Sequence, residues 1–371
     1  MTPEQKKKRV VIKIGSSSLT SRHGEISRKK LEKLTEEIVE LKDAGHEVVL
    51  VSSGAVAAGY RKLGCIVRPT SLPEKQAAAS IGQGLLMESY SELFLSHGYV
   101  ASQILITRSD FSDENRYNNV RNTIHVLLER GIIPIVNEND TVTIDRLKFG
   151  DNDTLAAKVA GLIQSDQLII LSDINGLYDA DPRKNRDAKL LENVYHITPE
   201  IEAGAGDSGS TIGTGGMRSK IDAAKIAMAS GITTFLGKAG KPNIICDAVS
   251  GRAMGTYFQV TDPTINLNQK KQWIAFHSGP EGEIHTNEAG RDAILMKKES
   301  LQTNFVNKVV GNFPKGAVVR IIDEENEEIG LGVVNFSAND ILDPERREED
   351  RVVIDVQDMV CHLDISIPVG L

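Results

Sequence analysis

The sequence has little cysteine and no long apolar run, and both shortages narrow what the protein can be. Cys65, Cys246 and Cys361 are odd in number and widely spaced, which excludes a disulfide framework and the CxxC spacing of a metal site. A reducing, cytoplasmic location fits this usage best. No apolar run reaches the ~18 residues of a membrane span. The basic amino terminus does not resemble a signal peptide, because Lys13 interrupts its apolar stretch.

The rest of the composition is that of a soluble globular protein. Of its 371 residues, 40% are hydrophobic and 25% are charged. A chain of this length exceeds the roughly 250–300 residues at which one core stops growing, so we expect two domains. The net charge of −8 is uneven, because from Gln272 onward 9 Lys and Arg stand against 19 Asp and Glu, a net of −10. A module this acidic repels a nucleic-acid backbone.

Apolar segments alternate with helical patterns up to about residue 260. Continuously apolar strands separated by helices predict an α/β fold with a mostly parallel sheet, covered by helices on both faces. The predicted strands are 10–14, 47–52, 99–106, 132–136, 167–171 and 232–236, and the predicted helices are 27–44, 73–95, 115–130, 153–163 and 216–230.

The pattern changes in the last third of the chain. Residues 261–274 offer turn formers without periodicity and are predicted to be a linker between a catalytic domain, 1–260, and a second domain, 275–371. Short β-like segments with turn glycines predict that the second domain is small and β-rich.

Polar clusters directly follow four of the predicted strands. They are Gly15–Ser18, Ser52–Gly54, Asn137–Asp140 and Ser172–Asp173. Ligands of parallel α/β sheets bind beyond the carboxyl ends of the strands, so we expect these clusters to meet at one edge of the sheet.

Two lysines beside small residues point to phosphate chemistry. Lys13 interrupts a strand that should be buried, and its charge should meet an anion, unless it lies at a strand end and reaches water. Lys220 ends the glycine-rich segment Thr211–Lys220, which could also be a flexible surface connection. Fixed cations on both sides of a transferring phosphoryl group stabilise its charge without covalent chemistry.

Carboxylates and amides cluster near two of the predicted strand ends. Glu138, Asp140, Asp151 and Asp153 would repel one another unless cations lie among them. Asp153 or Asn152 could merely cap the helix predicted at 153–163, and Ser53 could be an ordinary helix cap. An ammonium-binding Asp140 and a polar Asn152 would suit a zwitterionic substrate.

Six sequence blocks occur in one order along the chain: VVIKIGSS, VSSGAVAAG, PIVNENDTV, FGDNDTLAA, LSDINGLYDADPR and GTGGMRSKIDAA. In this order they resemble the amino acid kinase superfamily, and the segments GEIHTNEAGRDAIL and VVGNFPKGAVVRI resemble a PUA domain. Within the superfamily, NEND and GDND together with a PUA tail are typical of the branch whose phosphoryl acceptor is glutamate.

The resemblance implies transfer of the γ-phosphoryl group of ATP to the side-chain carboxylate of L-glutamate, the first step of proline biosynthesis. It implies that Lys13 and Lys220 hold the transferring group and that Asp153 orients both lysines. Glutamate would be bound by Ser53, Gly54, Asp140 and Asn152. ATP would be bound by Lys13, Gly15, Ser172, Asp173, Thr214, Gly215, Gly216, Met217, Arg218, Ser219 and Lys220.

Cofactors and partners follow from the same resemblance. Mg²⁺ should arrive with the nucleotide, without a dedicated cage of protein ligands. Proline is expected as a feedback inhibitor, and a homo-oligomer is expected.

Three alternatives remain open at this point. The first is an RNA-binding protein, which the acidic tail argues against. The second is a kinase for another small carboxylate or phosphate. The third is a catalytically inactive amino-acid sensor, which retention of Lys13, Lys220 and Asp153 disfavours.

Overall fold

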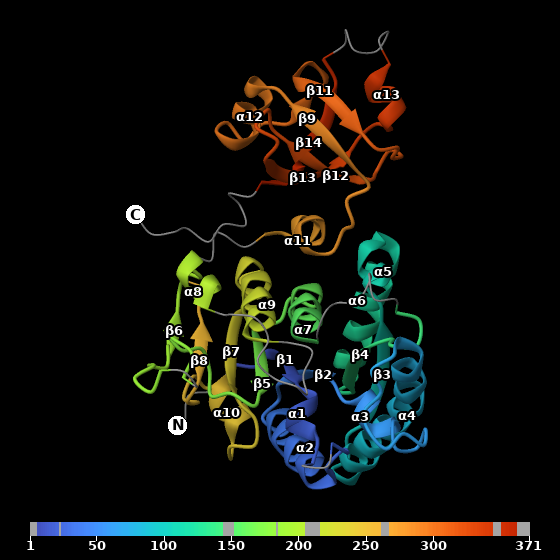
Figure 1. Cartoon of the computed structure of the whole chain (residues 1–371), viewed down its shortest axis with the longest axis vertical. Coiled ribbons are helices and arrows are strands. Elements are labelled where there is room, and N and C mark those ends of the chain that lie inside the picture. The colour runs from blue at the N-terminus through green and yellow to red at the C-terminus, as the bar shows by residue number, and fades with distance from the viewer. Residues whose placement is uncertain are drawn as a thin grey trace. The chain divides into compact units, whose positions relative to one another are not determined.

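The computed structural model describes residues 6–21, 24–143, 152–182, 185–204, 216–260, 267–343 and 350–361. The chain divides into two compact units. Unit 1 comprises Met1–Asp110 and Asn115–Pro263, and unit 2 comprises Phe111–Glu114 and Thr264–Leu371 (Figure 1).

Unit 1 is built on an eight-stranded sheet with the order β3-β4-β2-β1-β5-β7-β8-β6. Neighbouring strands pair in parallel, except that β7 and β8 pair antiparallel. The mostly parallel α/β fold is therefore confirmed. The strands are β1 Arg9–Ile14, β2 Glu47–Ser52, β3 Ala101–Ile106, β4 Ile133–Glu138, β5 Gln167–Ser172, β6 Asn193–Val194, β7 Thr233–Lys238 and β8 Thr256–Phe258.

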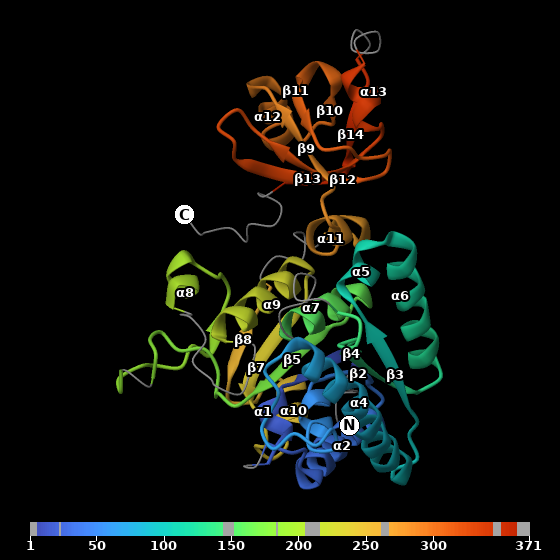
Figure 2. The ribbon, with the colours of Figure 1, turned by 45° about the vertical axis from the view of Figure 1, so that its right-hand side comes forward.

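Helices cover this sheet on both faces (Figure 2). The long helices begin and end within about two residues of their predicted bounds. The helices of unit 1 are α1 Ser16–Leu19, α2 Arg28–Asp43, α3 Ala55–Gly59, α4 Leu72–Ser96, α5 Arg108–Ser112 (of which Phe111 and Ser112 belong to unit 2), α6 Glu114–Glu129, α7 Asn152–Leu162, α8 Pro199–Gly204, α9 Met217–Ala229 and α10 Ile244–Val249.

Strand β1 shows how the sheet positions the site. Val10, Ile12 and Ile14 join the apolar cluster formed with α2, α4 and α10. Because side chains alternate along a strand, Lys13 faces the other side of the sheet. Helix α7 packs against β1 on that side and lies beside α9. Lys13 therefore points toward α7 and α9, the helices that carry Asp153 and Lys220.

Short elements were missed at the sequence level. Helices α1, α5, α8 and α10 span only 4 to 6 residues, too few for a helical apolar period to show. Strands β6 and β8, with 2 and 3 residues, were missed for the same reason. Ser16–Ser18, part of the polar cluster that follows β1, lie in α1, which begins after Gly15.

Unit 2 is a small β-rich fold with its own apolar core, as predicted. Its six-stranded sheet has the order β10-β14-β13-β12-β9-β11, and among the strands that the structure describes in this unit only β9 and β12 pair in parallel. The strands are β9 Gly282–Thr286, β10 Leu301–Gln302, β11 Val306–Val310, β12 Val318–Ile322, β13 Glu328–Val334 and β14 Val352–Cys361. The helices are α11 Gln269–Phe276, α12 Glu288–Leu295, the 3-10 helix η3 Thr303–Phe305 and α13 Ala338–Leu342.

The segment predicted as a linker contains regular structure. Helix α11 begins at Gln269, inside the predicted linker 261–274, and is capped by the side chain of Asn268, which accepts a hydrogen bond from the Lys271 backbone N–H. Residues 261–266 lie outside the described residues. The domain bounds 1–260 and 275–371 stay a prediction.

Candidate active site

A carboxylate lies between two lysine ammonium groups on one face of the unit 1 sheet. Asp153, in the first turn of α7, forms an ion pair through Oδ1 with Lys13 of β1. Its other oxygen, Oδ2, lies 3.0 Å from Nζ of Lys220, in the first turn of α9. The exposed fractions of the three residues are 6% for Lys13, 0% for Asp153 and 6% for Lys220. The anion that the sequence required for Lys13 is thus Asp153.

The charges of this triad fix the protonation state of its carboxylate. Burial acts to raise the pKa of Asp153, but the charges of Lys13 and Lys220, together with their hydrogen bonds, outweigh burial and hold the pKa well below its usual range. The carboxylate is therefore ionised at neutral pH. With two ammonium groups and one carboxylate, the triad carries a net charge of +1 and suits a bound anion.

The start of α9 adds donors around the same carboxylate. The Ser219 hydroxyl lies 3.0 Å from Oδ2 of Asp153 and 2.9 Å from the Gly216 carbonyl oxygen. Lys220 Nζ also donates to that carbonyl, at 3.3 Å. A 13-residue helix leaves its first backbone N–H groups unpaired, and these favour an anion such as phosphate.

Two other predicted ATP-binding residues, Gly15 and Ser172, lie at the ends of the neighbouring strands β1 and β5. Gly15 lies at the end of β1, and a Cβ there would come within 3.6 Å of Lys13 Nζ. Ser172 ends β5, the strand beside β1, and its hydroxyl donates to the exposed Asp173 at 3.1 Å.

The rest of the glycine-rich segment is only partly described. Arg218 pairs with Glu202 and Asp222 at 3.6 and 3.2 Å, and Met217 is the first residue of α9. Thr214 and Gly215 lie outside the described residues.

Amide side chains join the ends of three elements next to the triad. Asn152, adjacent to Asp153, donates from Nδ2 to Ser53 Oγ at 2.7 Å, to the Ser52 carbonyl oxygen at 3.2 Å and to Asn137 Oδ1 at 3.1 Å. The predicted meeting of the clusters after β2 and β4 is thus observed. Residue 54 has φ +113°, which favours glycine, and this turn leads from Ser53 into α3.

Asp140 lies in a small concavity beside these amides. The concavity has a volume of about 250 Å³ and is also lined by Glu138, Asn139 and Gln83. Gln83, which comes from α4, and Asn137 were not among the residues predicted to bind substrate or nucleotide. A glutamine within the largely apolar buried stripe of α4 was the available signal. Asp151 lies outside the described residues.

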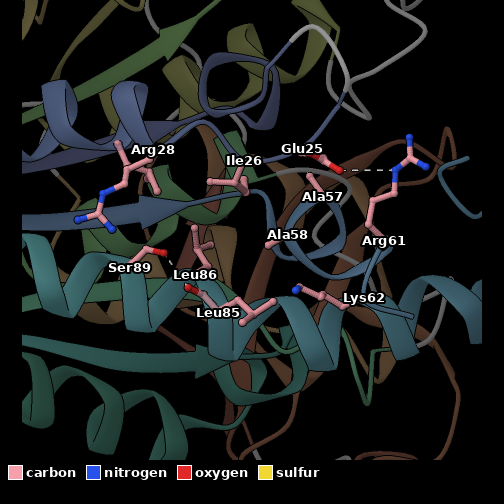
Figure 3. A pocket seen from close by; sticks show the side chains of 11 residues that line it. Glu25, Ile26, Arg28, Ala57, Ala58, Arg61, Lys62, Leu85, Leu86 and Ser89 are labelled. Atoms are coloured by element: carbon pink, nitrogen blue, oxygen red, sulfur yellow. Dashed lines mark hydrogen bonds and ion pairs between the residues drawn. The ribbon is translucent and has the colours of Figure 1, made fainter. Parts of the chain in front are cut away.

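A second concavity of unit 1 contains none of the predicted site residues. It has a volume of about 500 Å³ and an apolar floor that includes Ile26, Leu85 and Leu86 (Figure 3). At its rim Arg61 pairs with Glu25 at 3.6 Å, an exposed pair of the kind that contributes little free energy. This concavity lacks the buried opposite charges of the triad, so we do not assign the reaction to it.

Comparison with known proteins decides the family. A model described as the amino acid kinase family matches residues 8–238. The chain belongs to this family. A second model, for the PUA domain, matches residues 283–354 of this kinase. The predicted resemblance to both is confirmed.

Curated relatives of the kinase match along its full length. It is 64% identical over 372 residues to "Glutamate 5-kinase 2" of Bacillus subtilis (strain 168), covering 100% of both chains. It is also 64% identical to "Glutamate 5-kinase 2" of Bacillus licheniformis, covering 99% of this chain and 100% of the relative. Among solved structures, a carbamate kinase from Giardia lamblia bound to AMP-PNP aligns with a TM-score of 0.51 at 20% identity, over 68% of this kinase and 99% of that chain. This likeness shows the fold alone.

Two further features of the kinase concern membrane spans and metal sites. Among the helices that the structure describes, none combines the length and apolar character needed to span a bilayer. Within the described ranges, no group of three or more His, Cys, Asp or Glu side chains is arranged to hold a metal ion.

Proposed function

We propose that the chain transfers the γ-phosphoryl group of ATP to the side-chain carboxylate of L-glutamate, giving L-glutamyl 5-phosphate in the first step of proline biosynthesis. The observation that carries this proposal is the buried triad of Lys13, Asp153 and Lys220. Relatives named glutamate 5-kinase that match the whole chain at 64% identity support glutamate as the acceptor.

The chemistry asks for charge stabilisation rather than for a strong base. The side-chain carboxylate of glutamate is ionised at neutral pH and attacks as it stands. One of its oxygens forms a bond to the γ-phosphorus, and the bond from that phosphorus to the bridging oxygen of ADP breaks. Lys13 and Lys220 neutralise the charge on the phosphoryl oxygens and on the ADP that leaves. Each well-placed cation stabilises the transition state by about 3 kcal/mol.

Asp153 holds the two lysines in place and does not itself take part in bond making. Asp153 contacts both lysine ammonium groups, and Lys220 Nζ also donates to the Gly216 carbonyl oxygen, so the protein holds both cations in place. Fixing both ammonium groups before ATP binds removes the cost of ordering two flexible side chains at the moment of transfer.

The amide cluster is the proposed acceptor side of the site. Asn152 directly precedes Asp153 of the triad in the sequence, and its side chain donates to Ser53, which is followed by Gly54. These three residues therefore lie next to the triad. Asp140, in the adjoining concavity, is proposed to bind the ammonium group of glutamate. This arrangement would place the acceptor carboxylate toward Lys13 and the charged amino-acid end toward β4.

Mg²⁺ is proposed to enter with the nucleotide, where it would neutralise phosphate charge. Both oxygens of Asp153 are engaged by lysines, so this carboxylate does not fit a role as metal ligand. Phosphate oxygens and water are then the ligands that remain, in keeping with the reluctance of Mg²⁺ to lose its water shell.

An acceptor panel tests the proposal. ADP release by the purified chain is measured with glutamate, aspartate, acetylglutamate, carbamate and UMP in turn. We expect turnover with glutamate well above that with the others. Turnover with another acceptor and not with glutamate would reassign the substrate, and no turnover with any would favour the inactive sensor.

Regulation, assembly and location are further parts of the proposal. Proline resembles glutamate in its amino-acid end, so it is proposed to inhibit the enzyme, and adding proline to the same assay measures this directly. A homo-oligomer and a cytoplasmic location are proposed as well, the latter from three cysteines that are all free.

A further inference from the structure

Helix α4 carries two buried polar side chains on its stripe facing the sheet of unit 1. Gln83 and Tyr90 are 9% and 0% exposed and lie two turns apart, so they point the same way. Buried polar groups are usually hydrogen-bonded, because desolvating them without a partner costs free energy. The Tyr90 hydroxyl lies 2.9 Å from Ser52 Oγ, and Gln83 meets Asn137 of β4.

Gln83 begins a chain of three side-chain amides. Its Oε1 accepts a hydrogen bond from Asn137 Nδ2 at 2.9 Å, a contact that is buried. Asn137 Oδ1 accepts in turn from Asn152 Nδ2 at 3.1 Å. Asn152 also donates to Ser53 Oγ, so the chain ends among the residues proposed to bind glutamate.

One backbone group sets the direction of the whole chain. The Glu138 N–H lies 2.9 Å from the Asn137 side chain and can only donate, so the atom facing it must be Oδ1. Asn137 then has Nδ2 directed at Gln83, which must present Oε1. The same assignment makes Asn152 present Nδ2, and it decides which atom of Asn152 is left for the substrate.

We infer that Gln83 is a positioning residue for the phosphoryl acceptor. It acts through Asn137 on Asn152 and does not need to touch the reacting atoms. The inference rests on the proposed function, since it concerns how glutamate is bound in that same site. Without Gln83, the buried Nδ2 of Asn137 loses its acceptor, and the Asn137 amide can shift away from the position in which its Oδ1 holds Asn152 toward Ser53.

The test compares two methionine substitutions on the same helix. Q83M keeps the length of the side chain and removes its hydrogen bond. Q76M is the matched control, because Gln76 also lies on α4 and donates, at 3.0 Å, to the Thr143 carbonyl oxygen rather than to the amide chain. The measurements are kcat, the KM values for glutamate and ATP, and the thermal unfolding midpoint of each purified protein.

We expect Q83M to raise the KM for glutamate about tenfold and to leave the KM for ATP unchanged, while Q76M leaves both unchanged. Unchanged glutamate kinetics in Q83M would overturn the inference. So would an equal rise in both KM values accompanied by a fall in the unfolding midpoint, because that is the result of general destabilisation.

A double substitution tests whether Gln83 acts through Asn152. In the N152A background, Q83M should add little further loss of glutamate affinity, because the group it positions is gone. Full additivity of the two effects would overturn the relay. If the wild-type chain turns over ATP without using glutamate, the proposed function fails together with the inference. If the wild type uses glutamate and Q83M matches it, only the inference fails.

Discussion

At the scale of single residues, the site depends on two cations with one shared counterion. Lys13 and Lys220 come from elements more than 200 residues apart in sequence and meet only at Asp153. Because both lysines are buried, water screens their charges less than it screens the charge of a surface lysine. The effect of each on a bound phosphate should therefore be large.

Removing either lysine should abolish most of the turnover. K13A and K220A are each expected to lower kcat about a hundredfold or more, because each removes a cation proposed to stabilise the transferring group. A steady-state ADP-release assay measures the change, and circular dichroism shows whether each variant is folded. Near-normal turnover of a folded variant would remove that lysine from the proposed mechanism.

The lowered pKa of Asp153 predicts how stability depends on pH. The D153N variant leaves two buried ammonium groups without a counterion, so it should be less stable than the wild type by about 3–5 kcal/mol at neutral pH. Because the folded-state pKa is depressed, this advantage of the wild type is fully present above the ordinary aspartate pKa of about 4 and is lost as the pH falls through the folded-state value.

Urea unfolding of both proteins at a series of pH values from neutral to acid measures this difference. Equal stability of the wild type and D153N at neutral pH would show that the ion pairs contribute nothing net.

At the scale of elements, helices α3 and α4 cross with their backbones in contact. A Cβ added to Gly82 would lie 1.8 Å from the Ala55 carbonyl oxygen, and one added to Gly59 would lie 1.9 Å from that of Ala78. Neither glycine is needed for its own backbone angles. Both are needed because there is no room for a methyl group between the helices.

Alanine substitutions on α4 should separate crowding from helix propensity. G82A forces the helices apart and should lower the free energy of unfolding by about 1–3 kcal/mol or more. G84A is the matched control, since a Cβ there meets nothing within 4 Å, and it should raise stability by roughly 0.5–1 kcal/mol. The urea midpoints of both variants give the comparison, and a G82A protein as stable as the wild type would contradict the tight crossing.

The same two helices show what the sequence can predict. The bounds of α2 and α4 were both predicted closely, although only α2 has a clear apolar stripe, a long pattern that depends on local spacing. Helix α3 was expected only as a helix start at Ser53, without an end, because its alanine, valine and glycine residues form no apolar period and pack against a helix that is distant in sequence. The buried position of Lys13 predicted a neighbouring anion, but that this anion is Asp153 depends on how α7 packs against β1. For Gln83 no local rule names a partner, since Asn137 lies 54 residues away.

At the scale of the whole molecule, the two units differ in charge and in role. Unit 1 contains the triad and the amide chain, and the residues from Gln272 onward carry a net charge of −10. The PUA domain matches residues 283–354 within that acidic part. Its charged side chains include pairs of Arg320 with Glu283 and Glu328 on the sheet, which neutralise one of the few cations available for a phosphate.

Full-length protein should therefore not retain RNA. We expect no shift of a labelled single-stranded or duplex RNA in a gel assay at about 0.15 M salt, because nucleic-acid binding depends on cations that replace counterions of the phosphates. Retention that weakens steeply with added salt would contradict this expectation and would assign a nucleic-acid role to the PUA domain.

The close crossing of α3 and α4 at Gly59 and Gly82 limits how the proposed acceptor site of this enzyme can change. The turn at Gly54 leads into one of these helices and the amide chain starts from the other, so widening the proposed acceptor site for a bulkier acid would break the close packing between α3 and α4. A descendant of this protein with a different acceptor would have to exchange side chains along β4 and its following loop, where Asp140 lies, and keep both glycines.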